Sequence, residues 1–432
     1  MKNRIFSILG MTIISFTVAC NPPAPAQAVD TRTSAPELEI TQSPVPLTNT
    51  PEPASPPIPT STTIPPLEAH RSVTFTDLHM FDDMRGWGIE FAGHIVHTID
   101  GGRTWQDVTP PQRLQFIAGG FFALNADTAW ATPIYDRQDL DTNGVTIWHT
   151  GDGGKTWNAG PPPCLNGECG YSADVRAQVY YPRTLQFVDA KTGWLLVVVD
   201  QLTMQNRYRL YQTLDGGVTW NFIMDNLTGP VASIARGIAF TDAHAGWFGV
   251  SQVGGAEEPN PDWYLYKTMD GGHTWDTVDL PEPATLPEEF AQNPYGCGAD
   301  QVGITPSKSI DLTFYCDVNK GSHPRFFFHF HYVGGGNWRV WQESGPNRVS
   351  FIDATRGWRL TDRDDGNHDL EQTRDGGLHW VLVEMVEWAG SLDFINARVG
   401  WALTNSGDAT ALFRTVDGGQ TWTEIKPVTA GQ

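Results

Sequence analysis

Basic residues are scarce in this chain, and the shortage limits the partners it can have. The sequence has 28 lysines and arginines against 49 aspartates and glutamates, which gives a formal net charge of −21. A chain this acidic is not expected to take nucleic acid or an anionic membrane surface as its main partner. Common enzyme motifs are missing as well: there is no Gly-x-Ser-x-Gly, no phosphate-binding loop and no His-Glu-x-x-His. The sequence therefore offers none of these indications of catalysis.

The apolar stretch at the N-terminus is too short to cross a bilayer. It runs from residue 5 to residue 18 behind two basic residues and has the form of a signal peptide. It ends in Thr17-Val18-Ala19-Cys20, which resembles a bacterial lipobox. Residues 1–19 are thus expected to be a lipoprotein signal peptide, with Cys20 receiving the lipid. An ordinary secretory signal with an incidental cysteine is the alternative.

Residues 20–70 lack the side chains needed to form a core. Between residues 21 and 70 there are thirteen prolines, eight threonines and four serines, and no phenylalanine, tyrosine or tryptophan. Such a composition predicts a disordered, semi-extended tether. Because two or more acyl chains hold a protein on a membrane stably, the lipid and tether would place the rest of the chain on the extracytoplasmic face of a bacterial cell envelope.

A turn with the pattern Asp-Gly-Gly-x-Thr-Trp recurs from residue 71 to residue 432. The full copies, one with His in place of Thr, begin at Asp100, Asp152, Asp215, Asp270, Asp375 and Asp417. A worn copy, Val333-Gly-Gly-Gly-Asn-Trp338, fills the one long gap. The tryptophans of successive copies are 42 to 63 residues apart. This spacing is typical of a repeat fold with insertions.

A second pattern, Phe-x-Asp-x-x-x-Gly-Trp, runs in phase with the first. Its clear copies end at Trp194, Trp247 and Trp358, and looser copies end at Trp87, Trp130 and Trp401. Both patterns alternate and favour β-branched and aromatic residues, as strands do. The sequence therefore predicts an all-β fold for residues 71–432: a seven-bladed β-propeller of four-stranded antiparallel blades, preceded by the disordered linker.

The repeated aspartates are interpreted as structural. Glycine supplies the positive φ of a tight hairpin, and aspartate accepts hydrogen bonds from nearby backbone N–H groups. The alternative is that these carboxylates are catalytic or bind metal. Identical turns in every blade would spread them around the ring, whereas catalysis needs groups that converge on one point.

The turn resembles the Asp box, or BNR repeat, of sialidases, sortilin-type receptors and some glucan hydrolases. Together with the Gly-Trp partner and the lipoprotein start, it is most similar to the photosystem II assembly and stability factor family. The resemblance covers residue 71 to the end. It implies a non-enzymatic, membrane-anchored scaffold that binds a protein partner and assists a membrane complex. A glycan-binding or sialidase-like hydrolytic propeller is the alternative, although the Arg-Ile-Pro signature of sialidases is missing.

Four cysteines besides Cys20 fit an oxidising or export compartment. They are expected to form two disulfides, and the economical pairing joins neighbours in sequence: Cys164 with Cys169, and Cys297 with Cys316. Other pairings stay open, because four cysteines allow three connectivities. A zinc site made of the same four is the rival, but no Cys-x-x-Cys supports it.

Three arginines precede the first strands of their blades. Arg183 and Arg236 each lie four residues before a strand phenylalanine, and Arg348 lies three before Phe351. Equivalent positions on innermost strands should bring them to the axial mouth, on the face that carries the long loops. The resemblance implies an arginine patch there, so these residues are the candidate partner-binding site. The alternative is three structural arginines paired with acids.

Metal and cofactor sites are weakly indicated. Asp139, Asp141 and Asn143 match the first half of a calcium loop, but position twelve is Thr150 rather than Glu, which favours a solvated turn. His329 and His331 fall on one face of a strand, yet no third ligand is evident, so two half-buried histidines are the preferred interpretation.

No cofactor is expected. The chain is expected to be a monomer whose partners are an envelope or membrane protein and the membrane itself.

Overall fold

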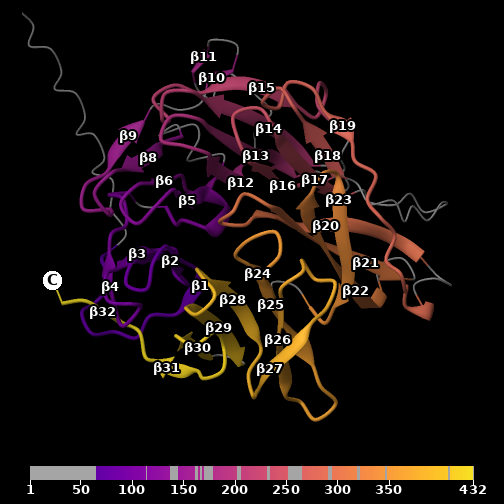
Figure 1. The fold of residues 1–432 in the computed structure, drawn as a ribbon. Helices are drawn as coiled ribbons and strands as arrows, with labels where there is room; N and C mark the ends of the chain where they lie inside the picture. The colour runs from indigo at the N-terminus through magenta and orange to yellow at the C-terminus, as the bar shows by residue number, and fades with distance from the viewer. Residues whose placement is uncertain are drawn as a thin grey trace, which may run out of the picture. The chain divides into compact units, whose positions relative to one another are not determined.

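The computed structural model describes residues 65–431 except 113, 137–144, 161–163, 166–167, 170–178, 202–205, 231–233, 252–264, 290–293, 319–321, 346–347 and 407–408. The chain divides into two units, Met1–Pro59 and Thr60–Gln432, and the described residues belong to the second. Their fold is all-β, with several four-stranded antiparallel sheets and the 3-10 helix η1 (Ala118–Gly120) (Figure 1). No helix in this described part is long and apolar enough to span a membrane.

The first two sheets come from the N-terminal part of the described chain, together with its last strand. Their strands are β1 (Phe75–Met80), β2 (Gly86–Glu90), β3 (Ile95–Thr98), β4 (Thr104–Asp107), β5 (Phe121–Ala123), β6 (Ala129–Ala131), β8 (Ile147–Thr150), β9 (Asn158–Gly160) and β32 (Val428–Thr429). The first sheet has the order β1-β2-β3-β4-β32, and the second has the order β5-β6-β8-β9.

The third sheet adds short strands to a four-strand unit. Its strands are β7 (Tyr135–Asp136), β10 (Cys164–Leu165), β11 (Glu168–Cys169), β12 (Val179–Phe187), β13 (Gly193–Gln201), β14 (Asn206–Thr213) and β15 (Asn221–Asp225). The order is β11-β10-β15-β14-β13-β12-β7, so the unit β12–β15 lies in the middle. In the added hairpin, the backbones of Cys164 and Cys169 face each other.

The fourth sheet joins two units that the repeat predicts as separate. Its strands are β16 (Ile234–Phe240), β17 (Gly246–Ser251), β18 (Leu265–Thr268), β19 (Asp276–Thr277), β20 (Pro294–Ile304), β21 (Ile310–Val318), β22 (Ser322–Gly334) and β23 (Asn337–Glu343). The units meet where Ser251 on β17 pairs with Gly298 on β20. Glycine permits this approach, because a Cβ at position 298 would lie 2.2 Å from that of Ser251.

The last two sheets have the simple four-stranded order of the repeat, β24 to β27 and β28 to β31. Their strands are β24 (Val349–Phe351), β25 (Gly357–Asp362), β26 (His368–Thr373), β27 (Val381–Val386), β28 (Gly390–Phe394), β29 (Gly400–Ser406), β30 (Ala409–Thr415) and β31 (Thr423–Ile425).

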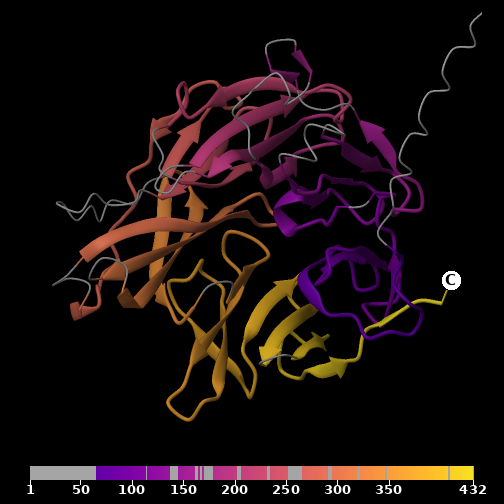
Figure 2. The same ribbon diagram turned by 180° about the vertical axis from the view of Figure 1, so that it is seen from behind.

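The C-terminal strand returns to the first sheet. β32 runs parallel to β4, with Val428 paired to Thr104, and Figures 1 and 2 show the two strands side by side. Residues 65–70, within the segment assigned to the linker, contact the same sheet: Leu67 is buried in its core and donates its N–H to Asp107. The two ends of the described chain are therefore tied together.

Each Asp-Gly-Gly turn is held by its own aspartate. In the turn between β14 and β15, Asp215 accepts hydrogen bonds from the Thr219 N–H at 2.8 Å and the Thr219 hydroxyl at 2.6 Å. Gly216 and Gly217 have φ of 77° and 91°, a region that favours glycine. Partial burial acts to raise the pKa of Asp215, but these hydrogen bonds lower it overall. The same bonding recurs at Asp100, Asp152, Asp270, Asp375 and Asp417.

Four tryptophans of the Gly-Trp pattern connect their own unit to an Asp-Gly-Gly turn of the next. The Trp194 indole N–H donates to the Gly271 carbonyl in the following Asp-Gly-Gly turn, and its ring stacks on Phe240 at 3.8 Å. Trp401 in the last sheet donates in the same way to Gly101 in the first. The other bonds of this kind run from Trp130 to Gly216 and from Trp358 to Gly418. In these four contacts, the Gly-Trp pattern supplies the indole N–H and the Asp-Gly-Gly turn supplies the carbonyl.

Backbone hydrogen bonds place the Asp-Gly-Gly turns beside the turns between first and second strands. The Gly216 N–H, for example, donates to the Lys191 carbonyl at 2.8 Å, and Lys191 lies in the turn between β12 and β13. Arg236 lies near the start of β16 and Arg183 in the middle of β12, so both are set back from the strand ends that lead into these turns. The arginines and the Asp-Gly-Gly turns therefore occupy opposite faces.

Replacing Asp215 with alanine should destabilise one turn modestly. We expect a loss of about 0.5–2 kcal/mol, the usual cost of removing a side chain that caps backbone N–H groups, because water satisfies part of the exposed turn. Urea unfolding checks this, with Asp215→Asn, which keeps one acceptor oxygen, as the milder control. Because the pKa of folded Asp215 lies below 3.8, its contribution should be full above about pH 4 and fade as the pH falls further. A loss that is the same at pH 7 and pH 2 would contradict this assignment.

Candidate functional site

Arg183 and Arg236 lie at equivalent irregular positions on two neighbouring strands. The pairing of β12 with β13 shifts register between Pro182 and Thr184. The pairing of β16 with β17 shifts between Ala235 and Gly237. Both arginines are therefore β-bulge residues, and a bulge redirects a side chain out of the regular alternation of its strand. The same β-bulge thus occurs in two units of the repeat, with an arginine at the bulge in each.

A third bulge brings an acidic residue to the same place. The pairing of β20 with β21 shifts register between Ala299 and Gln301, which leaves Asp300 at the bulge. Asp300 lies near enough to Arg183 to oppose the lowering of its pKa. Asp300 could not be found from the sequence patterns, because its unit has Ile304 where the units of Arg183, Arg236 and Arg348 have a phenylalanine.

Arg236 is held firmly by side chains of its own sheet. Its Nε donates to the Ser251 hydroxyl at 2.9 Å, and its Nη2 donates to the Tyr315 hydroxyl at 2.6 Å. The Tyr315 ring also lies under the guanidinium of Arg325, at 4.3 Å from its centroid. Arg325 in turn makes a two-point ion pair with Asp317. Arg236 is thus oriented before any ligand arrives.

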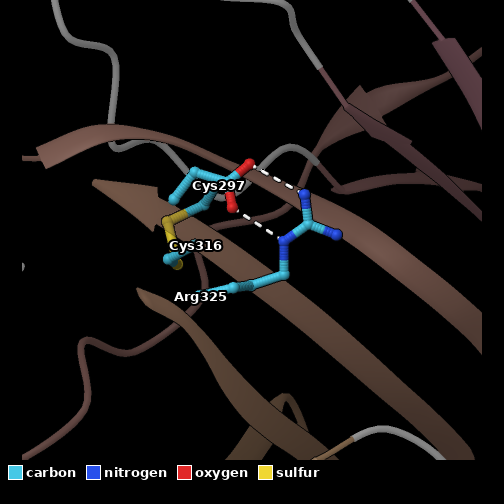
Figure 3. Close-up of a disulfide and its surroundings, with 4 residues drawn as sticks. Cys297, Cys316 and Arg325 are labelled. Carbon is cyan, nitrogen blue, oxygen red and sulfur yellow. Dashed lines mark hydrogen bonds and ion pairs between the residues drawn. A yellow bond between two sulfur atoms is a disulfide. The ribbon is translucent and has the colours of Figure 1, made fainter. Parts of the chain in front are cut away.

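A disulfide supports the strand that carries these partners. Cys297 on β20 is bonded to Cys316 on β21, which is one of the two pairings expected from the sequence. Cys316 stands between Tyr315 and Asp317, and Figure 3 shows the disulfide beside Arg325. The bond fixes two of the strands on which the arginine site is built.

Arg183 is less well satisfied than Arg236. Its guanidinium lies 5.4 Å from the centroid of the Tyr181 ring, and its Nε is buried without a hydrogen-bond partner. Burial lowers the pKa of Arg183, and the like charge of Arg236 lowers it further. Two neighbouring guanidinium groups, one with an unused buried donor, form a place where an anion would be stabilised, since arginine suits carboxylate recognition. We call Arg183, Arg236, Tyr181 and Tyr315 the arginine site.

Arg348 does not belong to the arginine site. It lies three residues before its strand phenylalanine rather than four, so its register differs, and it forms an ion pair with Asp362. Asp362 also faces His368 at 2.9 Å. The structure brings Arg183 and Arg236 near each other and pairs Arg348 with an acid, as the alternative of structural arginines expects for this residue. The convergence of all three at the axial mouth stays a prediction.

Arg348 instead lines a polar cavity of about 240 Å³. Its other polar lining residues include His79, Asp311, His329, Glu343 and Asp393. Burial raises the pKa of Glu343 to about 7, against the opposing effect of Arg359. Burial likewise raises the pKa of Asp393. For Asp311 burial is outweighed by hydrogen bonds with His329 and His331, which lower its pKa. The surroundings of the cavity thus shift the pKa values of its carboxyl groups in opposite directions.

The histidine pair on β22 has the third neighbour that the sequence did not reveal. Asp311 on β21 faces both rings, at 3.3 Å from His329 and 2.5 Å from His331. His331 is fully buried and His329 nearly so, rather than half-buried as predicted. Asp311 was missed because the pairing of β21 with β22 is visible only in the folded chain.

The remaining candidates divide in two. Asp139, Asp141 and Asn143 lie outside the described residues, as do the side chains of Cys164 and Cys169. Tyr181 and Glu371, a tyrosine and a glutamate that a sialidase-like site could use, have different surroundings: Tyr181 lies at Arg183, whereas Glu371 is bound to Arg359 at 2.8 Å and neighbours Glu343.

Comparison with known proteins gives similarity of fold. No protein-family model and no curated protein matches the chain. The solved structure of YCF48 bound to D1 peptide is 17% identical with a TM-score of 0.46, and the match covers 83% of this chain and 96% of that one. YCF48 from Cyanidioschyzon merolae is 14% identical with a TM-score of 0.41, covering 84% and 100%. The GH74 enzyme of Niastella koreensis is 14% identical with a TM-score of 0.48, covering 85% and 55%. Similarity at this level concerns the fold and assigns no role to a residue.

Proposed function

We propose that the chain is a lipid-anchored, seven-bladed β-propeller that binds a protein partner of the cell envelope through its arginine site. Four-strand units linked by Trp-to-glycine contacts, including the one from Trp401 to Gly101, support a closed ring of blades. The lipid on Cys20 and the tether up to residue 70 hold this ring on the extracytoplasmic side of a membrane. The protein acts there as a non-enzymatic scaffold in the assembly or stability of a membrane complex.

One observation carries the proposal: the unpartnered, buried Nε of Arg183 beside the fixed guanidinium of Arg236. An unmet buried donor costs free energy, and such a cost is recovered when a ligand supplies the acceptor. Carboxylates of an acidic protein segment have the matching charge and geometry. Tyr181 and Tyr315 add the aromatic surface that is frequent at protein interfaces. The partner is therefore expected to present an acidic segment.

Charge reversal at the arginine site should weaken partner binding. The full mature protein serves as bait for detergent-solubilised envelopes, and Arg183→Glu with Arg236→Glu should recover several-fold less of the wild-type partner. The difference should be larger at low salt, since screening grows above ~0.1 M. Arg103→Glu is the matched control, because Arg103 is exposed on an Asp-Gly-Gly turn on the other face. Melting curves must show that the double variant is folded.

The reverse pattern would overturn the proposal, with binding lost in Arg103→Glu and kept in the double variant.

A glycan-binding or hydrolytic propeller is the second candidate, favoured by the polar cavity in which Glu343 carries a pKa of about 7. Hydrolysis of sialyl or glucan substrates by the pure protein, abolished in Glu343→Gln and retained in the arginine double variant, would favour that candidate.

A further inference from the structure

We propose that Asp311, His329 and His331 form a binding site for a divalent transition metal of the zinc type, in the wall of the polar cavity. The inference is independent of the arginine site. Their three ligand atoms, one carboxylate oxygen and two imidazole nitrogens, lie within 4.8 Å of one another. Two imidazoles with one carboxylate is a donor set that suits zinc and related ions, whereas calcium prefers oxygen alone.

The three side chains are placed by two adjacent strands. In the pairing of β21 with β22, Asp311 stands directly opposite His331, and Thr313 stands opposite His329. His329 and His331 are two residues apart and so point to the same face. His329 stacks on Trp341 at 4.8 Å, and His331 stacks on Phe351 at 3.8 Å. The rings are thus fixed by packing, as ligands of a preformed site must be.

The surroundings of His331 leave one nitrogen directed at the proposed ion. Its Nε2 lies 3.0 Å from the Ala354 carbonyl, which can only accept, so Nε2 carries the hydrogen. Its Nδ1 then faces the Asp311 carboxylate, which when ionised is also only an acceptor. Either a second proton or a cation must lie between them. A hydrogen bond from the outer nitrogen to a backbone carbonyl is the usual support of a metal-bound histidine.

One of the two ligand distances that involve Asp311 already suits zinc. With zinc bonds of about 2.0–2.2 Å, two ligand atoms of a tetrahedral site lie about 3.3 Å apart. Asp311 and His329 are at 3.3 Å already, and the 2.5 Å between Asp311 and His331 would have to widen. Asp311 and His329 both open on the cavity, which leaves room for a fourth ligand such as water.

A second observation points to a ligand in the same cavity. Glu343 also lines it, is 5% exposed, and has a buried Oε2 without a hydrogen-bond partner. Buried polar atoms are normally satisfied, and an exception calls for an explanation. A hydrated cation beside Asp311 and His329 would bring water donors into this cavity. Zinc would thus explain why His331 Nδ1 faces the Asp311 carboxylate. Its bound water would supply a hydrogen-bond donor for Glu343 Oε2.

Calorimetric titration of the full mature protein with Zn²⁺, after treatment with a chelator, tests the site. We expect one equivalent to bind and to raise the melting temperature, as a ligand of the folded state does. Asp311→Asn and His329→Gln should weaken binding at least about 100-fold, since even loss of an outer-shell partner costs about 10- to 100-fold. Ca²⁺ should not bind there. The arginine double variant should bind zinc as the wild type does.

His379→Ala is the matched control, because exposed His379 faces Asp375 at 2.7 Å and offers a surface histidine–carboxylate pair. Zinc affinity should be unchanged in this variant. Circular dichroism and melting curves establish that each variant is folded. If Asp311→Asn does not fold, His329→Gln decides the result. No stoichiometric zinc binding by the wild type, or unchanged binding in folded His329→Gln, would overturn the proposal and leave the three residues as a buried ion pair.

Discussion

Replacing Trp401 with alanine is expected to lower the free energy of unfolding by about 3–5 kcal/mol, the usual range for a fully buried aromatic side chain. Trp401 is 0% exposed and packs in one core with Val96 and Trp105 of the first sheet. Its indole N–H donates to the Gly101 carbonyl, 300 residues away in the chain. The substitution therefore removes core volume and a bond between the last and first sheets at once. Urea unfolding at neutral pH measures the loss.

Trp338→Ala is the matched control for this experiment. Trp338 belongs to the worn turn and is only partly buried against its own sheet. It should cost clearly less than Trp401→Ala. Trp401→Phe, which keeps most of the apolar volume, should fall between the two. Equal losses in Trp401→Ala and Trp338→Ala would show that the contact between the chain ends has no special part in stability.

Replacing Cys20 with alanine is expected to abolish lipid attachment altogether. Without the thiol no thioether-linked lipid can be attached at this position. The variant should either be released into the soluble extracytoplasmic fraction or accumulate with its signal peptide uncleaved. Fractionation with mass spectrometry of the mature N-terminus measures the change, and Thr33→Ala in the tether is the control. A variant that partitions and migrates like the wild type would contradict the lipoprotein interpretation.

Local patterns in the sequence predicted much of the strand pairing. The copy of the Phe-x-Asp-x-x-x-Gly-Trp pattern that ends at Trp247 lies on two paired strands, with Ile238 opposite Phe248. The pair closed by the Asp215 turn is confirmed as well, with Tyr211 opposite Phe222. These predictions succeed because a hairpin is a short-range structure whose turn chemistry and alternation are written in adjacent residues.

The candidate sites depend on information that is not local. A bulge exists only relative to a partner strand, so the shared position of Arg183, Arg236 and Asp300 emerges only from the register of three separate pairs. Asp311 joins His329 and His331 through a pairing across 18 to 20 residues, in the unit that has only the worn turn and no copy of the Gly-Trp pattern. For Arg348, one residue of offset from the other arginines was visible in the sequence, and it was the signal that this side chain differs.

Photocrosslinking from the two faces of the protein in its own cells tests the central claim most directly. A photoreactive phenylalanine derivative replaces Tyr181 at the arginine site or Gln420 on an Asp-Gly-Gly turn of the opposite face, in the full lipid-anchored protein. We expect a discrete adduct with one envelope or membrane protein from position 181, lost when Arg183 and Arg236 are reversed in charge, and none from position 420. An adduct with the same partner from position 420 alone would contradict it.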